Sequence, residues 1–148
     1  MNRRAILLGI AAMPLVAGPA WAAKPAVFAV DGLAIRGYDP VAYFKENQPV
    51  MGDAAYAAEW QGATWHFASA ANRDAFVAAP QDHAPQYGGY CAYAVSKGGI
   101  ATTQPDTWTV HDGRLYLNYN LTVRDIWRQD VAGNVARADA LWPGVLDA

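Results

Sequence analysis

The sequence predicts an α+β fold, in which a small antiparallel sheet built from hairpins packs against short helices. Three dipeptides that favour tight hairpin turns, Asp31-Gly32, Gln61-Gly62 and Asp112-Gly113, are each flanked by strand-forming residues. No strand–helix–strand repeat links them, which argues against a parallel α/β sheet. The 148 residues are 53% hydrophobic, which suits the core of one domain.

The three predicted hairpins pair residues 27–30 with 33–36, 56–60 with 63–68, and 108–110 with 115–119. In the second hairpin a two-residue turn sets Trp60 opposite Ala63 and, by regular continuation, Tyr56 opposite Phe67. That register also makes Glu59 diagonal to His66 on the outer face.

Helices are predicted from capping residues. Asp39 followed by Pro40 predicts a short apolar turn over 41–44. Ser69 predicts a helix that runs to Ala79. Phe76 and its neighbours in the second helix are expected to face inward.

Two further helical regions are predicted in the second half of the chain. A short helix over 90–95, with Cys91 at its start, ends at Gly98. Asn120 caps a helical extension that ends near Trp142 and that Gly133-Asn134 is expected to divide in two.

Residues 1–22 have the pattern of a secretory signal peptide. Arg3-Arg4 form a basic start, an apolar stretch over 5–16 follows, and the segment ends in Ala20-Trp21-Ala22. The stretch is too short to cross a bilayer, so we expect cleavage after Ala22 and no membrane span thereafter. The prediction is a periplasmic or secreted protein, exported by the Sec or the twin-arginine route, whose single domain covers residues 23–148.

Charge and motifs exclude several functional classes. The net charge is −2 and no run of basic residues occurs, which argues against a nucleic-acid partner. The sequence has no phosphate-binding loop, dinucleotide fingerprint, HExxH motif or nucleophile elbow. We therefore predict no catalytic residues and favour binding over catalysis.

Cys91 is the sole cysteine, so an exported domain of this sequence has no internal disulfide. Three interpretations stay open: a small buried core residue, a soft-metal ligand, or a reactive thiol whose pKa is lowered at a helix start.

The chain resembles a YHS domain of the exported bacterial type. The resemblance rests on Asp39-Pro40-Val41, on Trp65-His66-Phe67-Ala68-Ser69 with Arg73, Phe76 and Pro80, and on the extension over 85–93. Metal-handling members of that family carry clustered cysteines, and Ala42, Ala68 and Asn72 stand at those positions here. The resemblance thus implies the scaffold, and a metal function would need new ligands.

Cys91, His83 and His66 are the candidate metal ligands. His83 precedes Cys91 in a loop that could fold back onto it, and Glu59 could orient the ring of His66. Copper or another soft transition metal suits a thiolate with imidazoles, and Met51 could complete such a site. For both histidines an ordinary structural role is the alternative.

Three functional hypotheses follow. The first is an exported YHS-type binding module for a soft metal such as copper or for a metal-containing cofactor. The second is a thiol-dependent redox protein or enzyme that uses Cys91. The third is a structural or interaction domain that binds no metal.

Overall fold

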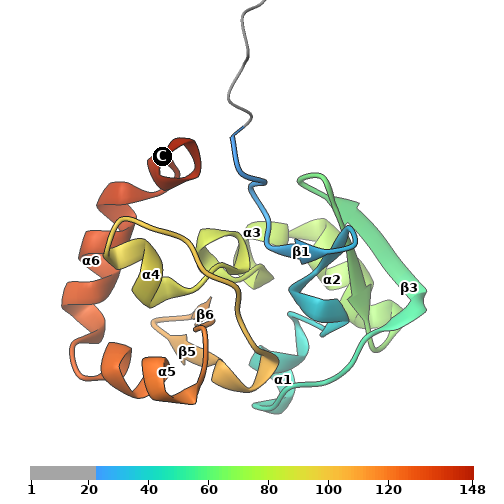
Figure 1. Cartoon of the computed structure of the whole chain (residues 1–148). Coiled ribbons are helices and arrows are strands. Elements are labelled where there is room, and N and C mark those ends of the chain that lie inside the picture. Colours follow the sequence, from blue (N-terminus) through green and yellow to red (C-terminus); the bar gives the residue numbers. More distant parts are fainter. Residues whose placement is uncertain (1–22) are drawn as a thin grey trace, which may run out of the picture.

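The computed structural model describes residues 23–148, so the predicted signal peptide lies outside the described residues. Figure 1 shows the four-stranded sheet on one side of the molecule and α4, α5 and α6 on the other. The strands are β1 (Ala29–Val30), β2 (Leu33–Ala34), β3 (Asp53–Trp60), β4 (Ala63–Phe67), β5 (Thr109–His111) and β6 (Arg114–Tyr116). The helices are α1 (Ala42–Glu46), α2 (Ala70–Ala78), α3 (Pro80–His83), α4 (Ala92–Ser96), α5 (Leu121–Arg128) and α6 (Val131–Leu141). Short 3₁₀ turns are η1 (Ile35–Gly37), η2 (Gln86–Gly89), η3 (Pro105–Thr107) and η4 (Gly144–Asp147).

The α+β class is confirmed, but the main sheet is mixed and not purely antiparallel. Its strand order is β1-β2-β4-β3, and β2 pairs in parallel with β4 through Leu33 and Thr64. The hairpin turns determine that β1 pairs with β2 and β3 with β4. Which edges of the two hairpins then meet depends on tertiary packing, and this the turn residues do not encode. The β5–β6 hairpin forms a separate two-stranded sheet.

The β3–β4 hairpin keeps the predicted register only near its turn. Trp60 pairs with Ala63 and Ala58 with Trp65, as predicted, whereas Asp53 pairs with Phe67 because an irregularity lies between Asp53 and Ala57. The predicted pairing of Tyr56 with Phe67 is therefore wrong. A bulge inserts extra residues into one strand, and a simple alternation pattern does not reveal it.

Side-chain caps confirm two of the predicted helix starts. The Ser69 hydroxyl accepts a hydrogen bond from the Asn72 amide, and Asn120 Oδ1 accepts one from the Val123 amide. The predicted break at Gly133-Asn134 is wrong, because α6 runs through both residues. The break lies at Asp130, whose carboxylate accepts from the Gly133 amide and starts a new helix.

Two apolar clusters form the core. The first joins the main sheet to α2 and to β6, and includes Trp65, Phe67, Phe76 and Leu115. The second joins η2, α4, α5 and α6, and its largest members are Tyr87, Tyr90, Tyr116 and Trp127.

The two ends of the described chain lie side by side. The Lys24 amide donates to the Leu146 carbonyl over 2.9 Å, and Lys24 Nζ donates to the Ala148 carbonyl over 2.7 Å. Next along the chain, the Phe28 amide donates to the Gly88 carbonyl over 2.9 Å. Residues 24–28 thus bind both η4 and η2.

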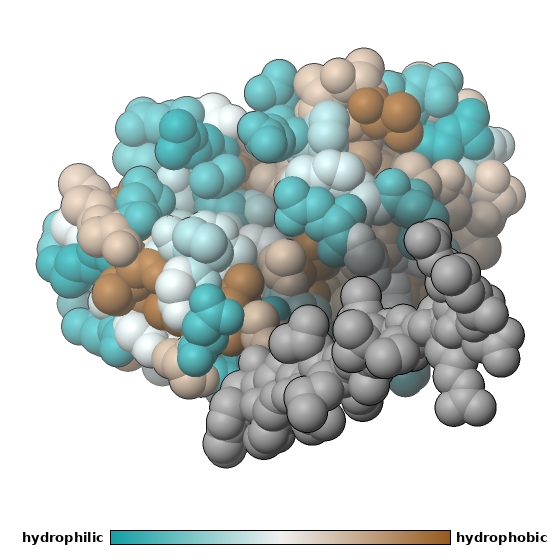
Figure 2. Space-filling model, turned by 90° about the horizontal axis from the view of Figure 1, so that it is seen from above, coloured by the Kyte–Doolittle hydropathy of each residue, from teal (hydrophilic) through white to brown (hydrophobic). Residues whose placement is uncertain are grey.

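On the face seen in Figure 2, apolar residues lie in small separate areas. Figure 2 shows hydrophilic and hydrophobic residues intermixed on the visible face. Within residues 23–148, no helix has the length and apolar character needed to cross a bilayer.

Candidate functional site

Cys91 is a buried core residue at the start of α4, with 1% of its surface exposed. Its thiol donates to Asn118 Oδ1 over 3.5 Å, and Asn118 Oδ1 also accepts from the Tyr93 amide. Burial raises the pKa of the Cys91 thiol, although the backbone amides of Ala94, Tyr119 and Tyr93 act in the opposite direction. The suggested lowering of this pKa at a helix start is therefore wrong, because desolvation outweighs the amide dipoles.

The two candidate histidines lie in ordinary structural surroundings. His83 ends α3, where its Nδ1 is 3.1 Å from the Ala79 carbonyl oxygen and its ring meets that of Phe44 edge-on at 5.8 Å. His66 is half-buried on β4, and Glu59 does not orient its ring as suggested, because the Glu59 carboxylate accepts from the Thr64 hydroxyl instead.

The structure does not bring Cys91, His83 and His66 together as a metal site. Among residues 23–148, no three His, Cys, Asp or Glu side chains are grouped so that they could hold a metal ion. Met51, suggested as a further ligand, is 60% exposed. The donor set thus does not fit a soft-metal centre, which needs several thiolate or imidazole ligands around one point.

The positions at which the resembled family carries cysteines, 42, 68 and 72, are occupied by a hydrogen-bond network around Asp39. One oxygen of this fully buried carboxylate accepts from the Ala42 amide, and the other accepts from the Ala68 amide and from Asn72 Nδ2. Lys45 Nζ in turn donates to Asn72 Oδ1. These groups satisfy one another and hold α1, β4 and the start of α2 together.

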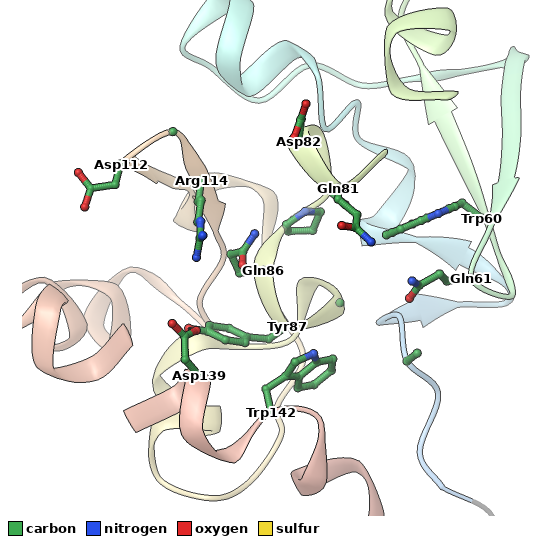
Figure 3. A pocket seen from close by; sticks show the side chains of 15 residues that line it. Trp60, Gln61, Gln81, Asp82, Gln86, Tyr87, Asp112, Arg114, Asp139 and Trp142 are labelled. Carbon is green, nitrogen blue, oxygen red and sulfur yellow. The ribbon is translucent and has the colours of Figure 1, made fainter. Parts of the chain in front are cut away.

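A cavity of about 680 Å³ lies between the β3–β4 turn, the α3–η2 segment, the β5–β6 turn and the end of α6 (Figure 3). We call it the cleft. Its polar and aromatic lining residues are Trp60, Gln61, Gln81, Asp82, Gln86, Tyr87, Asp112, Arg114, Asp139 and Trp142.

The floor of the cleft is formed by a strained backbone segment in η2. Tyr87 and Gly88 both have positive φ, at 59° and 63°. A side chain at Gly88 would clash with the Ala26 carbonyl oxygen, so only glycine fits there. A non-glycine residue in this region, such as Tyr87, is uncommon and is enriched at functional sites.

Tyr87 connects the floor to the wall of the cleft. Its hydroxyl donates to Asp139 Oδ1 on α6 over 2.9 Å. Burial, followed by the hydrogen bond to Asp139, raises the pKa of Tyr87 far above its ordinary value, while Arg114 lowers it. The hydroxyl therefore stays protonated and keeps Asp139 in a fixed position.

Three glutamines and two tryptophans supply the remaining surface. In the part of the chain that the structure describes, the side-chain amides of Gln61, Gln81 and Gln86 make no hydrogen bond to protein. Trp60 and Trp142 are half-buried on either side of the opening, where Trp60 packs on Phe76 and Trp142 on Tyr87. The cleft thus offers directional polar groups between apolar ring faces.

Comparisons with known proteins identify no relative: no family model, no curated protein and no solved structure matches this chain. The cleft was not predicted from the sequence. Trp60, Gln61, Asp112 and Trp142 were named from the sequence only at hairpin turns and at a helix end, and not as ligand-binding residues. The two successive glycines at 88 and 89 are a local sequence sign of unusual backbone in this region.

Proposed function

We propose that this chain is an exported binding module of the YHS type that takes a small organic ligand in the cleft. The observation that carries the proposal is the set of unpartnered glutamine amides between two tryptophans, around a cavity of about 680 Å³. Pockets for small molecules typically have about 300–1,000 Å³ and combine aromatic walls with a few directed polar groups.

The backbone of the cleft supports this proposal. Holding Tyr87 in a left-handed conformation costs roughly 1 kcal/mol or more. Here that conformation turns the Tyr87 hydroxyl toward Asp139 and exposes the Gln86 and Gly88 positions to the cavity. Folded proteins retain such a strained conformation where it preorganises a binding surface.

The lining residues favour binding over catalysis by a thiol, serine or histidine nucleophile. They include three carboxylates, three amides and one guanidinium, and no cysteine, histidine, serine or lysine is among them. Cys91 does not line the cleft, so the thiol chemistry proposed from the sequence would need a different site.

Mapping of backbone amide shifts by NMR tests the proposal on the purified, ¹⁵N-labelled protein. The probes are water-soluble small molecules divided into neutral polyols, organic cations and carboxylates. We expect saturable shifts concentrated at Gln81, Gln86–Gly89 and Asp112–Arg114 for at least one group. Absence of saturable shifts in these segments with all three groups would overturn the proposal, as would shifts confined to the surroundings of Cys91.

A further inference from the structure

The charges of the cleft select against an anionic ligand, because its lining has three carboxylates and one guanidinium. Figure 3 shows Arg114 extending toward the Tyr87–Asp139 pair, while the carboxylates of Asp82 and Asp112 point away from the glutamines and tryptophans. One guanidinium and one carboxylate therefore lie near Tyr87, and two further carboxylates lie toward the rim. An anion would have to approach a lining of net negative charge.

The hydrogen-bonding groups suit a ligand that both donates and accepts. Each glutamine side chain offers two N–H donors and a carbonyl acceptor, and Gln61, Gln81 and Gln86 approach the cavity from three different segments. Asp139 adds an acceptor and Arg114 adds donors. Hydroxyl groups match such a mixed set, because each hydroxyl is at once a donor and an acceptor.

The aromatic walls suit a ligand with an apolar face. Trp60 and Trp142 come from opposite sides of the opening and are held by packing against Phe76 and Tyr87. A saturated ring whose C–H groups lie on one face can stack on an indole while its hydroxyls reach the amides at the edge. Carbohydrates combine these two properties in one molecule.

We propose that the ligand of the cleft is a carbohydrate without acidic groups, stacked on Trp60 or Trp142 and hydrogen-bonded by Gln61, Gln81 and Gln86. This inference rests on the proposed function, since it specifies the ligand class of the same cleft. It assigns the tryptophans to the ring faces, the glutamines to the hydroxyls, and the three carboxylates of the lining to the rejection of acidic sugars.

Tetrasaccharides that share the gluco configuration and differ in charge test this inference. The probes are glucose-based and glucuronate-based, and binding is followed by calorimetry and by tryptophan fluorescence. We expect the neutral probe to bind at least about tenfold more tightly than the acidic one. Trp142→Leu and Gln81→Ala should each weaken binding of the neutral probe at least about fivefold, whereas Gln129→Ala, an exposed glutamine outside the cleft, should leave it unchanged.

Other outcomes separate the ligand class from the proposed function. Equal or tighter binding of the glucuronate probe would overturn the carbohydrate inference while leaving a ligand-binding cleft in place. If no saccharide binds but another small molecule shifts the NMR signals of the cleft amides, the carbohydrate inference is likewise wrong and the ligand-binding cleft remains. Neutral-probe binding that survives both Trp142→Leu and Gln81→Ala would place the carbohydrate elsewhere and overturn the inference. The result for Trp142→Leu counts only if this variant still unfolds cooperatively on heating. If it does not, Gln81→Ala decides the test, because Gln81 is exposed.

Discussion

Two polar regions of this molecule differ in where their hydrogen bonds go. Around Asp39, every group named above is bonded to another protein group, and the carboxylate is fully buried. Around the cleft, the amides of Gln61, Gln81 and Gln86 face a cavity and make no bond to protein within residues 23–148. The difference separates polar residues that stabilise the fold from polar residues that are available to a ligand.

Asp39→Ala should produce the largest loss of stability. It removes the acceptor for the Val41 and Ala68 amides and for Asn72 Nδ2, and leaves these donors without a partner. We expect a loss of about 3 kcal/mol or more in the free energy of unfolding, measured by urea denaturation. A loss below about 1 kcal/mol would show that the network is not structural. Asp39→Asn, which keeps one acceptor oxygen, should lose less.

Gly88→Ala should have the next largest effect. It combines a positive φ with a clash against the Ala26 carbonyl, and we expect a loss of about 2–4 kcal/mol. Gly98→Ala is the matched control, because Gly98 also has positive φ but has open space around it, and should cost about 1 kcal/mol. Equal losses in the two variants would contradict a close approach at Gly88.

Alkaline pH should destabilise the protein through buried tyrosines in both regions. Burial raises the pKa of Tyr43 and of Tyr87 above the ordinary value of 10.0. Because the folded pKa is the higher one, stability is complete below about pH 10 and falls as pH rises further, by up to about 1.4 kcal/mol per pH unit for each group. Urea midpoints at pH 8, 10 and 11 measure the fall, and Tyr87→Phe should make it less steep. If the stability of Tyr87→Phe falls with pH as steeply as that of the wild type, Tyr87 does not contribute to the alkaline loss of stability.

Cys91→Ala should cost about 1 kcal/mol, because it removes a buried sulfur from the core. Elemental analysis of the wild type and the variant, purified without affinity metals, should give the same metal content. A stoichiometric metal that is lost in Cys91→Ala would restore the soft-metal hypothesis.

Gln81→Ala should change stability by less than about 0.5 kcal/mol, because the side chain is exposed and bonds to no protein group among the described residues. Ligand binding in the cleft should nevertheless weaken, as set out above. Comparing its urea midpoint with that of Asp39→Ala measures directly how the two polar regions differ. A stability loss as large as that of Asp39→Ala would abolish the distinction.

Local signals predicted the elements well. The turn dipeptides located all three hairpins, and Ser69 and Asn120 cap helices as expected. The errors arise where two local signals compete or where contacts are distant. Asp130 was not recognised as a cap, so the helix break was assigned to Gly133-Asn134, and the parallel β2–β4 pairing depends on packing between hairpins.

The candidate site was much harder to predict. The cleft draws on segments from Ala26 to Trp142, and each glutamine, taken alone, resembles an ordinary surface residue. Cys91 and the histidines attracted attention because their chemistry is distinctive, yet the structure places Cys91 in a core and His83 against Phe44. Residue type identifies reactive groups in a sequence, whereas convergence in space depends on the fold.

The pairing of residues 24–28 with η2 and η4 has a practical consequence for engineering. Because Lys24 bonds to Leu146 and Ala148, a short linker could join these two segments and make a circular permutant, opened at the exposed Gly98-Gly99 turn away from the cleft. Ala26 and Trp142 line the cleft, so a bulky fusion partner attached at either segment would begin beside its opening. A permutant with its new ends at Gly98-Gly99 would instead leave the opening accessible to immobilised saccharides or other surfaces.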